Sequence, residues 1–380
     1  MSKETILYVG NYELPDKGAS ANRVVSNGKL FQKLGYKTAY LGIRKGDSFK
    51  GIRVLDENLH MYEEAYPQGS KEWLLHMCST KNIELLVEKY PDTCMIILYN
   101  LPFILLCQAK RRFKNRNIKV VYDCTEWTGV TDGSFLKRVV KWVDEYFIRN
   151  YIGKVADGLI VISKMMEKQY QNCRNLVRIP PLVDINDYIW HQKAEKETDK
   201  KEFCFAGILD GNKDSVDKIV EAFSLLDNEN CLLRIIGVDR LEFDKAYPEM
   251  KNVLEQLGEK VLFMGTQSHK ETIKYVLGCD YYIFVRQSDR RNNAGFPTKF
   301  AESYTCGCPI ITTDISDIKD YLTEGGRVML LGPTSAEEIK VAMGEMLQKP
   351  QKDEIRLLDR SFHYESYQEK AQKWMKKLYN

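Results

Sequence analysis

The sequence predicts an α/β protein made of two doubly wound domains, and three observations support this fold class. Short apolar runs alternate with longer amphipathic segments along the chain, a pattern that favours a parallel sheet covered by helices on both faces. The alternation stops once, at Pro180-Pro181, and then begins again. A length of 380 residues suits two domains of ordinary size.

The first alternation begins with a buried strand over residues 6–10. A helix follows from Asn22, which suits the N-cap, and Gly35 ends it. The same pattern then repeats, because continuous apolar runs indicate buried strands and apolar residues at helical spacing indicate helices. It predicts strands at 36–43, 95–99, 119–123, 158–163 and 176–179, and helices at 71–90, 103–113, 135–155 and 164–170.

The second alternation starts beyond a charged segment at 191–202, which is expected to be an exposed loop. It predicts strands at 202–207, 231–237, 261–265, 281–286, 310–313 and 328–331, and helices at 215–226, 251–257, 270–277 and 335–348. We therefore place an N-terminal domain at 1–183 and a C-terminal domain at 184–361. The amphipathic tail at 362–380 is expected to pack back on the first domain, although its apolar face would also suit the second.

Composition argues against several classes of function. A formal net charge of +3 is too small to indicate nucleic-acid binding, and no recognition module is visible. No apolar run is long enough to span a membrane, and the first residues do not resemble a signal peptide. The ten cysteines lack paired spacing, and Cys306 and Cys308 are followed by no second ligand pair. We expect a cytoplasmic protein with reduced cysteines and no bound metal.

One stretch, 294–309, predicts a helix whose N-terminus binds an anion. Gly295 permits a sharp loop, Pro297 suits the first helical turn, and Gly307 suits the helix end. The free N–H groups and partial positive charge of such an N-terminus attract phosphate. Glu302 lies about one turn further, where it would accept hydrogen bonds from hydroxyls of the same ligand. The pattern therefore suits a nucleotide, although a buried helix of purely structural role would show it too.

The same stretch resembles the nucleotide-binding segment of the GT-B fold glycosyltransferases, specifically the large retaining family 4. That family has a Glu, seven residues, a second Glu, and a helix that ends in Gly-x-Pro before an apolar strand. Glu302 matches the second Glu and Gly307-Cys308-Pro309 matches Gly-x-Pro, whereas Ala294 replaces the first Glu. Residues 296–300 resemble the Phe-Pro-Thr-Lys-Phe variant of this motif that a bacterial subgroup of the family has.

Other landmarks of the family recur in the same order along the whole chain. Residues 207–214 resemble the first loop of the second domain, with Lys213 as the donor-phosphate lysine and Ile208 in place of the usual Arg. Residues 180–184 resemble the interdomain segment, and residues 11–23 and 123–127 resemble two first-domain loops. The resemblance implies the GT-B fold, in which two Rossmann-like doubly wound domains face each other across a cleft.

The resemblance also implies roles for donor-site residues. Glu302 would hold the ribose hydroxyls of a UDP- or GDP-sugar, and Lys213 would neutralise the diphosphate as the glycosidic bond breaks. Arg286, at a strand end, is our inference for the guanidinium missing at position 208. The alternatives are a solvent-facing Glu, a surface Lys and a salt-bridged Arg. The remaining predicted donor-binding residues are Ala294, Gly295, Phe296, Pro297, Thr298, Lys299 and Gly207.

On the acceptor side, Asp123 and Glu126 are predicted catalytic carboxylates, with Glu126 taking the proton of the acceptor hydroxyl. Trp127 would offer an apolar face on which a sugar ring stacks. The alternative is a capping Asp beside a buried Trp. The other residues predicted on the acceptor side are Gly18, Asn22 and Arg23.

The expected function is a metal-independent retaining glycosyltransferase that needs no cofactor and moves a sugar from a UDP- or GDP-sugar to a glycan or lipid-linked glycan in bacterial surface polysaccharide or glycoconjugate synthesis. Ala294 and Ile208 motivate an alternative, a non-catalytic GT-B protein that binds a nucleotide or glycan or supports a partner transferase. A sugar-nucleotide epimerase is a third reading that the five histidines disfavour. Basic residues interleaved with aromatics at 110–119 and 135–154 predict peripheral contact with an anionic membrane, or an ordinary solvated face.

Overall fold

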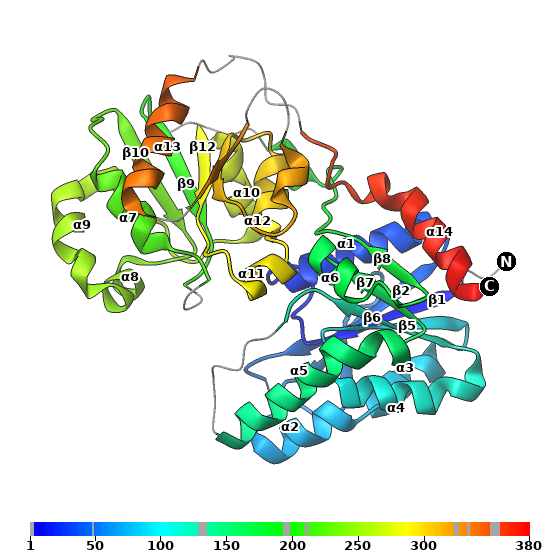
Figure 1. The fold of residues 1–380 in the computed structure, drawn as a ribbon. Helices are drawn as coiled ribbons and strands as arrows, with labels where there is room; N and C mark the ends of the chain where they lie inside the picture. Colours follow the sequence, from blue (N-terminus) through cyan, green and yellow to red (C-terminus); the bar gives the residue numbers. More distant parts are fainter. Residues whose placement is uncertain are drawn as a thin grey trace. The chain divides into compact units, whose positions relative to one another are not determined.

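The computed structural model describes residues 4–47, 49–127, 135–192, 198–209, 213–322, 327–332, 335–349 and 358–380. Contacts divide the chain into two units, drawn in Figure 1. The first unit comprises Met1–Val183, Ala294–Phe296 and His363–Asn380, and the second comprises Asp184–Asn293 and Pro297–Phe362. Each unit contains its own sheet with helices packed on it.

The sheet of the first unit has the strand order β3-β4-β2-β1-β5-β6-β7-β8 and is parallel except for β3. Its strands are β1 (Thr5–Gly10), β2 (Lys37–Arg44), β3 (Ile52–Asp56), β4 (Met61–Ala65), β5 (Thr93–Tyr99), β6 (Lys119–Cys124), β7 (Gly158–Val161) and β8 (Leu176–Arg178). The strands β3 and β4 were not predicted, because β3 is largely exposed and β4 carries acids, so neither shows an apolar run. The strand order reverses between β1 and β5, and ligands of such sheets bind at this switch point.

The helices of the first unit are α1 (Ala19–Lys33), α2 (Gly69–Cys78), α3 (Lys81–Lys89), α4 (Phe103–Phe113), α5 (Phe135–Val155), α6 (Lys164–Gln169) and α14 (Gln368–Tyr379). The single helix predicted at 71–90 is wrong. Ser79 and Thr80 separate α2 from α3, and their hydroxyls bond to Lys81 N and Glu84, which offers the backbone an alternative to a continuous helix.

The C-terminal helix α14 packs on the first unit. Its buried residues Ala371, Trp374, Met375 and Leu378 join the core that contains β1 and α1 residues. The Trp374 ring lies 6.5 Å from the Phe31 ring, and its Nε1 donates to Asn175 O over 3.0 Å. This helix therefore closes one face of the first sheet rather than extending the second unit.

The second sheet is parallel, with the order β11-β10-β9-β12-β13-β14. Its strands are β9 (Lys201–Ala206), β10 (Cys231–Ile236), β11 (Val261–Phe263), β12 (Tyr281–Phe284), β13 (Ile310–Thr313) and β14 (Val328–Leu331). The switch point lies between β9 and β12. The prediction of two doubly wound α/β sheets is therefore confirmed.

The helices of this half of the chain are α7 (Val216–Ser224), α8 (Arg240–Ala246), α9 (Lys251–Leu257), α10 (His269–Gly278), α11 (Arg290–Ala294), α12 (Thr298–Thr305) and α13 (Ala336–Gln348). Short 3₁₀ helices occupy Lys114–Arg116, Tyr188–His191, Pro248–Met250, Gly258–Lys260, Ile318–Tyr321 and Tyr364–Tyr367. The helices α8 and α11 were not predicted, since each is too short to show an apolar period. For α8 a signal existed, because Asp239 and Glu242 form a capping box.

Candidate functional site

A cluster of three charged side chains lies at the switch point of the second sheet. Asp214 comes after β9, Arg286 follows β12, and Lys299 is in the first turn of α12. Arg286 Nε donates to Asp214 Oδ1 over 2.5 Å and its Nη2 to Oδ2 over 3.3 Å, while Lys299 Nζ lies 2.7 Å from Oδ2. All three side chains are at most 12% exposed. The structure thus joins two predicted donor-site residues, Arg286 and Lys299, through a carboxylate that was not predicted.

The cluster carries an excess of positive charge in a poorly solvated place. Burial by itself would raise the pKa of Asp214, but the charges of Lys299 and Arg286 outweigh it and lower that pKa to about 2. Burial lowers the pKa of Lys299 to about 8, against the attraction of Asp214, and the charges of Arg286 and Lys213 act in the same direction as burial. Two cations that share one carboxylate retain charge for an anionic ligand.

Glycines at the strand ends make room for this cluster. A Cβ atom on Gly207 would lie 2.4 Å from Lys299 Nζ, a distance at which one of them must move. Lys299 Nζ also lies over the Phe205 ring, 4.5 Å from the ring centroid, in a cation–π contact. Gly237 has a φ of 91°, and its Cβ would lie 2.5 Å from Gly207 O. Gly207, which was predicted as a donor-site residue, therefore leaves space for Lys299.

The helix α12 has the N-terminus that the motif predicts, with one difference. Pro297 stands at the N-cap rather than within the first turn, and it provides no side-chain cap. The backbone bonds of the helix begin with Phe300 N, which donates to Pro297 O over 3.0 Å, so the amides of Thr298 and Lys299 precede them. At the other end, Gly307 has the φ of 69° that a helix-ending glycine adopts.

Glu302 lies on the same helix and is partly exposed. His269 Nε2 lies 3.0 Å from Glu302 Oε1, and the two side chains are 22% and 17% exposed. His269 was not predicted. Ser268 caps α10 by accepting a hydrogen bond from Glu271 N, which marks where the helix begins but gives no signal for the contact of His269 with Glu302.

The other predicted donor-site residues are dispersed. Ala294 is fully buried, and its carbonyl oxygen accepts a hydrogen bond of 2.6 Å from Ser163 Oγ within the first unit. Gly295 is half-buried, and Phe296 and Pro297 are buried. Ala294–Phe296 therefore group with the first unit, whereas the motif predicts one continuous donor loop.

Lys213 and Ile208 belong to a loop that the structure describes in part. Lys213 is half-buried and forms no hydrogen bond or ion pair with another residue that the structure describes. Ile208, which replaces the usual Arg, is 67% exposed. Residues 210–212 of the same predicted loop lie outside the described residues.

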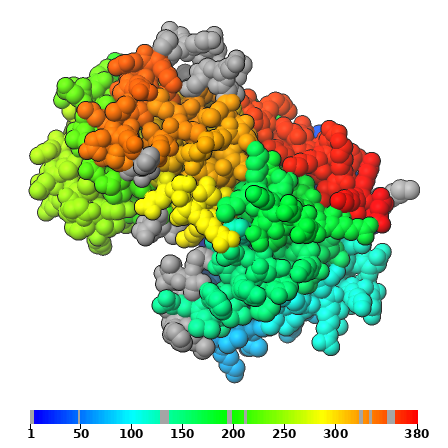
Figure 2. Space-filling view, in the orientation of Figure 1, coloured from blue at the N-terminus to red at the C-terminus, as the bar shows by residue number. Residues whose placement is uncertain are grey.

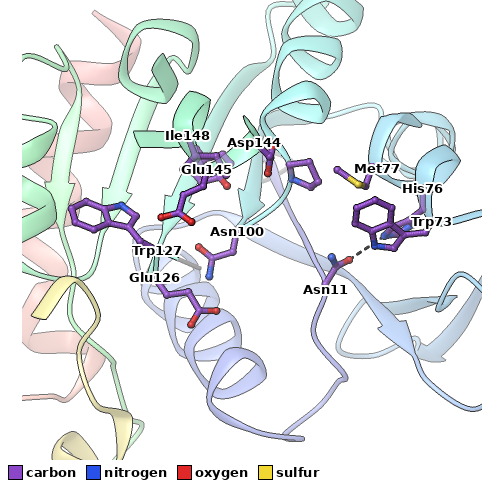
Figure 3. A pocket seen from close by; sticks show the side chains of 12 residues that line it. Asn11, Trp73, His76, Met77, Asn100, Glu126, Trp127, Asp144, Glu145 and Ile148 are labelled. Carbon is purple, nitrogen blue, oxygen red and sulfur yellow. Dashed lines mark hydrogen bonds between the residues drawn. The ribbon is translucent and has the colours of Figure 1, made fainter. Parts of the chain in front are cut away.

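The first unit has a pocket of about 130 Å³ near its own switch point (Figure 3). Asn11 follows β1, Asn100 follows β5, and Glu126 follows β6, so three strand ends supply polar groups to it. His76 Nε2 lies 3.1 Å from Asn11 Oδ1. The remaining lining residues are Trp73, Met77, Pro102, Tyr122, Trp127, Asp144, Glu145 and Ile148. Of these twelve, only Glu126 and Trp127 were predicted as site residues. Asn11 begins the stretch 11–23 that resembles a family loop, and the others come from α2, α5, β6 and the loop after β5.

The pocket is acidic. Glu126, Asp144 and Glu145 line it, whereas no Lys or Arg among the described residues does. Burial raises the pKa of Asp144 to about 6, although its carboxylate accepts a hydrogen bond of 2.8 Å from Phe103 N. Mixed carboxylate, amide and indole groups are suited to a polyhydroxylated ligand.

Asp123 and Arg23 form a buried ion pair, and this contradicts their predicted contact with a ligand. Arg23 Nη2 lies 2.8 Å from Asp123 Oδ1 and Nε 3.1 Å from Oδ2, and the hydroxyl of Tyr8 donates to Oδ2 as well. Asp123 is 0% exposed. Arg23 also donates to the carbonyls of Ile179 and Pro180, so both residues hold the first unit together.

Trp127 is buried as well, and its predicted open face is occupied. The Arg149 guanidinium lies 5.2 Å from its ring centroid, and its Nε1 lies 3.3 Å from the Tyr170 hydroxyl. Gly18 is exposed with a φ of 96° just before α1, and Asn22 lies in the first turn of that helix. The structure does not place Gly18 or Asn22 among the residues that line the pocket.

The described residues include neither a candidate metal cluster nor a candidate membrane span. Within those residues, no group of three or more His, Cys, Asp or Glu side chains is arranged to hold a metal ion. No helix in the same described ranges combines the length and the hydropathy that a membrane span requires.

Comparison with known structures identifies the fold. The chain is similar to a sucrose-phosphate synthase from Thermosynechococcus elongatus, with a TM-score of 0.72 at 13% identity over 99% of both chains. It is also similar to Anabaena Alr3699/HepE in complex with UDP and glucose, with a TM-score of 0.67 at 13% identity over 98% of this chain and 99% of that one. The chain has the GT-B fold.

A third GT-B structure with this similarity is the lipopolysaccharide outer core galactosyltransferase WaaB, with a TM-score of 0.63 at 15% identity over 98% of this chain and 99% of that one. Residues 187–360 match the family model described as glycosyl transferases group 1. No protein of curated function matches the sequence significantly. The matched residues contain the Asp214 cluster, α12 and Glu302.

Proposed function

We propose that this protein is a retaining, metal-independent glycosyltransferase that transfers a sugar from a UDP- or GDP-sugar to a glycan or lipid-linked glycan, in bacterial surface polysaccharide or glycoconjugate synthesis. One observation carries the proposal: Arg286 and Lys299 share Asp214 beside the N-terminus of the helix that bears Glu302. Cations and free amides suit a diphosphate, and a carboxylate one turn away suits ribose hydroxyls. HepE, a structural neighbour, is described in complex with UDP-glucose, which supports the donor class.

In the proposed reaction, the bond between the anomeric carbon and the diphosphate oxygen breaks, and a bond to the acceptor oxygen forms. The leaving nucleoside diphosphate takes the electron pair, so positive charge at Lys299, Arg286 and Lys213 stabilises it. The acceptor proton passes to the leaving phosphate oxygen when attack occurs from the same face, or to Glu126. These cations do the work of a metal ion, which is why we propose that neither a metal nor another cofactor is required.

The acceptor is proposed to bind in the pocket that Glu126 lines in the first unit. Ala294 favours a second candidate function. In the family that the sequence resembles, a carboxylate at this position contacts the donor sugar, and here a buried alanine replaces it. That second function is a non-catalytic GT-B protein that binds a nucleotide or glycan, or supports a partner transferase. We expect Ala294 to alter the choice of donor sugar instead.

The decisive experiment incubates the protein with a panel of UDP- and GDP-sugars and with free or lipid-linked glycans, without added metal and with a chelator. We expect release of UDP or GDP with at least one donor, at a rate that the chelator does not change. Binding of a nucleotide without release from any donor would favour the non-catalytic function. Release that requires a divalent cation would contradict metal independence.

A second experiment tests Glu302 by ribose discrimination. The protein should bind UDP or GDP more tightly than the corresponding 2′,3′-dideoxy nucleotide by roughly tenfold, because a hydrogen bond to a charged group contributes about 1.5 to 3 kcal/mol. Glu302→Gln should reduce this difference, whereas Glu255→Gln on α9 should leave it intact. Equal discrimination in Glu302→Gln and the unmodified protein would remove Glu302 from the site.

A further inference from the structure

Two cysteine thiols lie against each other in the second unit. Cys279 Sγ lies 3.4 Å from Cys308 Sγ, and Cys279 Sγ also donates to the carbonyl oxygen of Val276 over 3.3 Å. Each of the two cysteines is 1% exposed. The surface of this unit in Figure 2 is formed by other segments, such as α13 in orange. All ten cysteines are free thiols in the structure, so the contact joins two reduced side chains.

The backbone around this pair suits a disulfide. Cys279 stands two positions before β12, and Cys308 stands two positions before β13. These strands are parallel neighbours, with Tyr282 opposite Ile310. Neighbouring strands lie about 4.8 Å apart, and the Cα atoms of a disulfide lie roughly 4.4–6.8 Å apart. The bond therefore requires the two sulfurs to approach from 3.4 Å to about 2.05 Å, without any separation of the strands.

The pair lies at one end of two helices whose other residues belong to the candidate site. Cys279 is the C-cap of α10, and Cys308 follows the C-terminal end of α12. His269 begins α10 and lies 3.0 Å from Glu302 of α12. Lys299, in the first turn of α12, belongs to the charged cluster. The helices α10 and α12 thus connect the thiols, at the amino ends of the strands, to the site at the carboxyl ends.

We propose that Cys279 and Cys308 are a redox modification site, where hydrogen peroxide or another small peroxide forms a reversible disulfide that ties the end of α10 to the end of α12. One thiolate attacks the peroxide and becomes a sulfenic acid, while the O–O bond breaks and the departing oxygen leaves as water. The second thiol displaces the sulfenic oxygen as a second water and forms the S–S bond. Two electrons pass from the sulfurs to the peroxide, and both thiol protons end in water. Exchange with a dithiol reverses the step.

Burial makes this oxidation slow. Apolar surroundings disfavour the thiolate, which is the reactive form of a cysteine. Both cysteines stand beside helix ends, however, and such ends open locally at a smaller cost than the core of a unit. Gly307, with a φ of 69°, forms the turn that leads to Cys308. We therefore expect oxidation on the order of minutes to hours.

The disulfide would change the candidate site through α10 and α12. The sulfurs must approach by about 1.3 Å, and the close packing of the interior passes part of this movement to the helix ends. A binding site tolerates displacements of only about 0.5 Å. We expect the oxidised protein to bind UDP or GDP roughly tenfold more weakly. This consequence rests on the proposed function, whereas formation of the disulfide does not.

The test exposes the whole reduced protein to hydrogen peroxide, alkylates the remaining thiols in denaturant, and maps disulfides by mass spectrometry without reduction. Trypsin places Cys279 in peptide 275–286 and Cys308 in peptide 300–319. We expect the two peptides to be linked with the loss of two hydrogens, and dithiothreitol should separate them. Cys279→Ala and Cys308→Ala should each abolish the link.

Cys306→Ala and Cys231→Ala are the matched controls, because each removes another buried thiol of the second unit. The link should persist in both, although Cys306 shares peptide 300–319 with Cys308. Circular dichroism checks that every variant is folded. A link that Cys306→Ala removes would overturn the proposal. So would the absence of any link after a treatment that oxidises the half-buried Cys173.

Unfolding and nucleotide binding give two further readouts. The oxidised protein should unfold at a temperature higher by about 5 °C or more, because the bond closes a loop of 29 positions in the unfolded chain. Cys279→Ala, treated in the same way, should show neither this rise nor the loss of nucleotide affinity. A linked protein with unchanged affinity for UDP or GDP would refute the effect on the site. If the reduced protein binds neither nucleotide, the proposed function fails, while the peptide map and the unfolding temperature still decide whether the disulfide forms.

Discussion

Lys299 Nζ lies 2.7 Å from Asp214 Oδ2, and this pair connects the predicted phosphate-binding motif on α12 to the loop that follows β9. The contact spans 85 positions of sequence, and Arg286 completes it from the end of β12. Two strand ends and one helix are therefore joined through a single carboxylate. The arrangement explains how a chain with Ile208 in place of an arginine still gathers positive charge at the switch point.

Removing the carboxylate should destabilise the second unit. We expect Asp214→Asn to lower the free energy of unfolding by about 3 kcal/mol, because it leaves two mostly buried cations without their counter-ion. Urea unfolding of the two proteins measures the difference. The control is Asp244→Asn on α8, whose partner Arg240 is partly exposed, and it should cost less than about 0.5 kcal/mol. Similar losses in both variants would mean that the Asp214 cluster contributes no more than a surface pair.

The depressed pKa of Lys299 predicts a pH dependence of nucleotide binding. Burial lowers this pKa to about 8, so Lys299 is charged below pH 8 and becomes neutral above it in the free protein. A bound diphosphate favours the charged form, and binding above pH 8 must therefore take up a proton. The affinity for UDP or GDP should fall with rising pH by up to about tenfold per pH unit, beginning near pH 8.

Titration calorimetry over about pH 7 to about pH 10 in buffers of different ionisation enthalpy measures both the affinity and the proton uptake. Lys299→Arg should bind without the fall, since a guanidinium stays charged throughout this range. A fall of the same size in Lys299→Arg would assign the titration to another group.

Gly207 allows a test of the space that Lys299 needs. Gly207→Ala would place a methyl group 2.4 Å from Lys299 Nζ, so the ammonium must move and nucleotide affinity should fall roughly tenfold or more. The matched control is Gly344→Ala on α13, where nothing lies within 4 Å of the added Cβ. That change should leave binding intact and stabilise the helix by about 0.5 to 1 kcal/mol. Binding constants of the two variants measure the change in nucleotide affinity, and unfolding curves measure the change in stability. Equal affinity in Gly207→Ala and the unmodified protein would contradict the need for this space.

The sequence predicted the sheets better than it predicted the site, for physical reasons that particular residues show. Buried parallel strands such as β1 and β5 are continuous apolar runs, so they can be recognised from the sequence alone. The exposed strand β3 has no such run, and it was missed. Glu302 was predicted because a local motif contains it, whereas its partner His269 is 33 positions away and lies in no motif.

At the candidate site, the burial of individual side chains was the property that could be predicted least well from the sequence. Asp123 follows the pattern of a strand-end catalytic residue, yet its function in the fold depends on Arg23, 100 positions earlier, which encloses it. Asp214 lies at the end of the loop motif at 207–214, but its role was not predicted, because β12 and α12 bring the two cations to it from distant positions. In both cases the deciding contact is non-local, and periodicity carries no information about it.

The two carboxylates after β6 should therefore differ in what their loss affects. Asp123→Asn leaves Arg23 buried opposite a neutral amide, so it should lower the free energy of unfolding by about 3 kcal/mol. Glu126→Gln keeps the size of a half-buried side chain at the pocket and should change the stability by less than about 0.5 kcal/mol. If Glu126 takes the acceptor proton, kcat should fall roughly a hundredfold while nucleotide affinity stays the same. The kcat is measured with the sugar donor that the panel of UDP- and GDP-sugars identifies. An unchanged kcat in Glu126→Gln would leave deprotonation of the acceptor to the leaving phosphate, and a folded, stable Asp123→Asn with lowered kcat would restore Asp123 to the catalytic group.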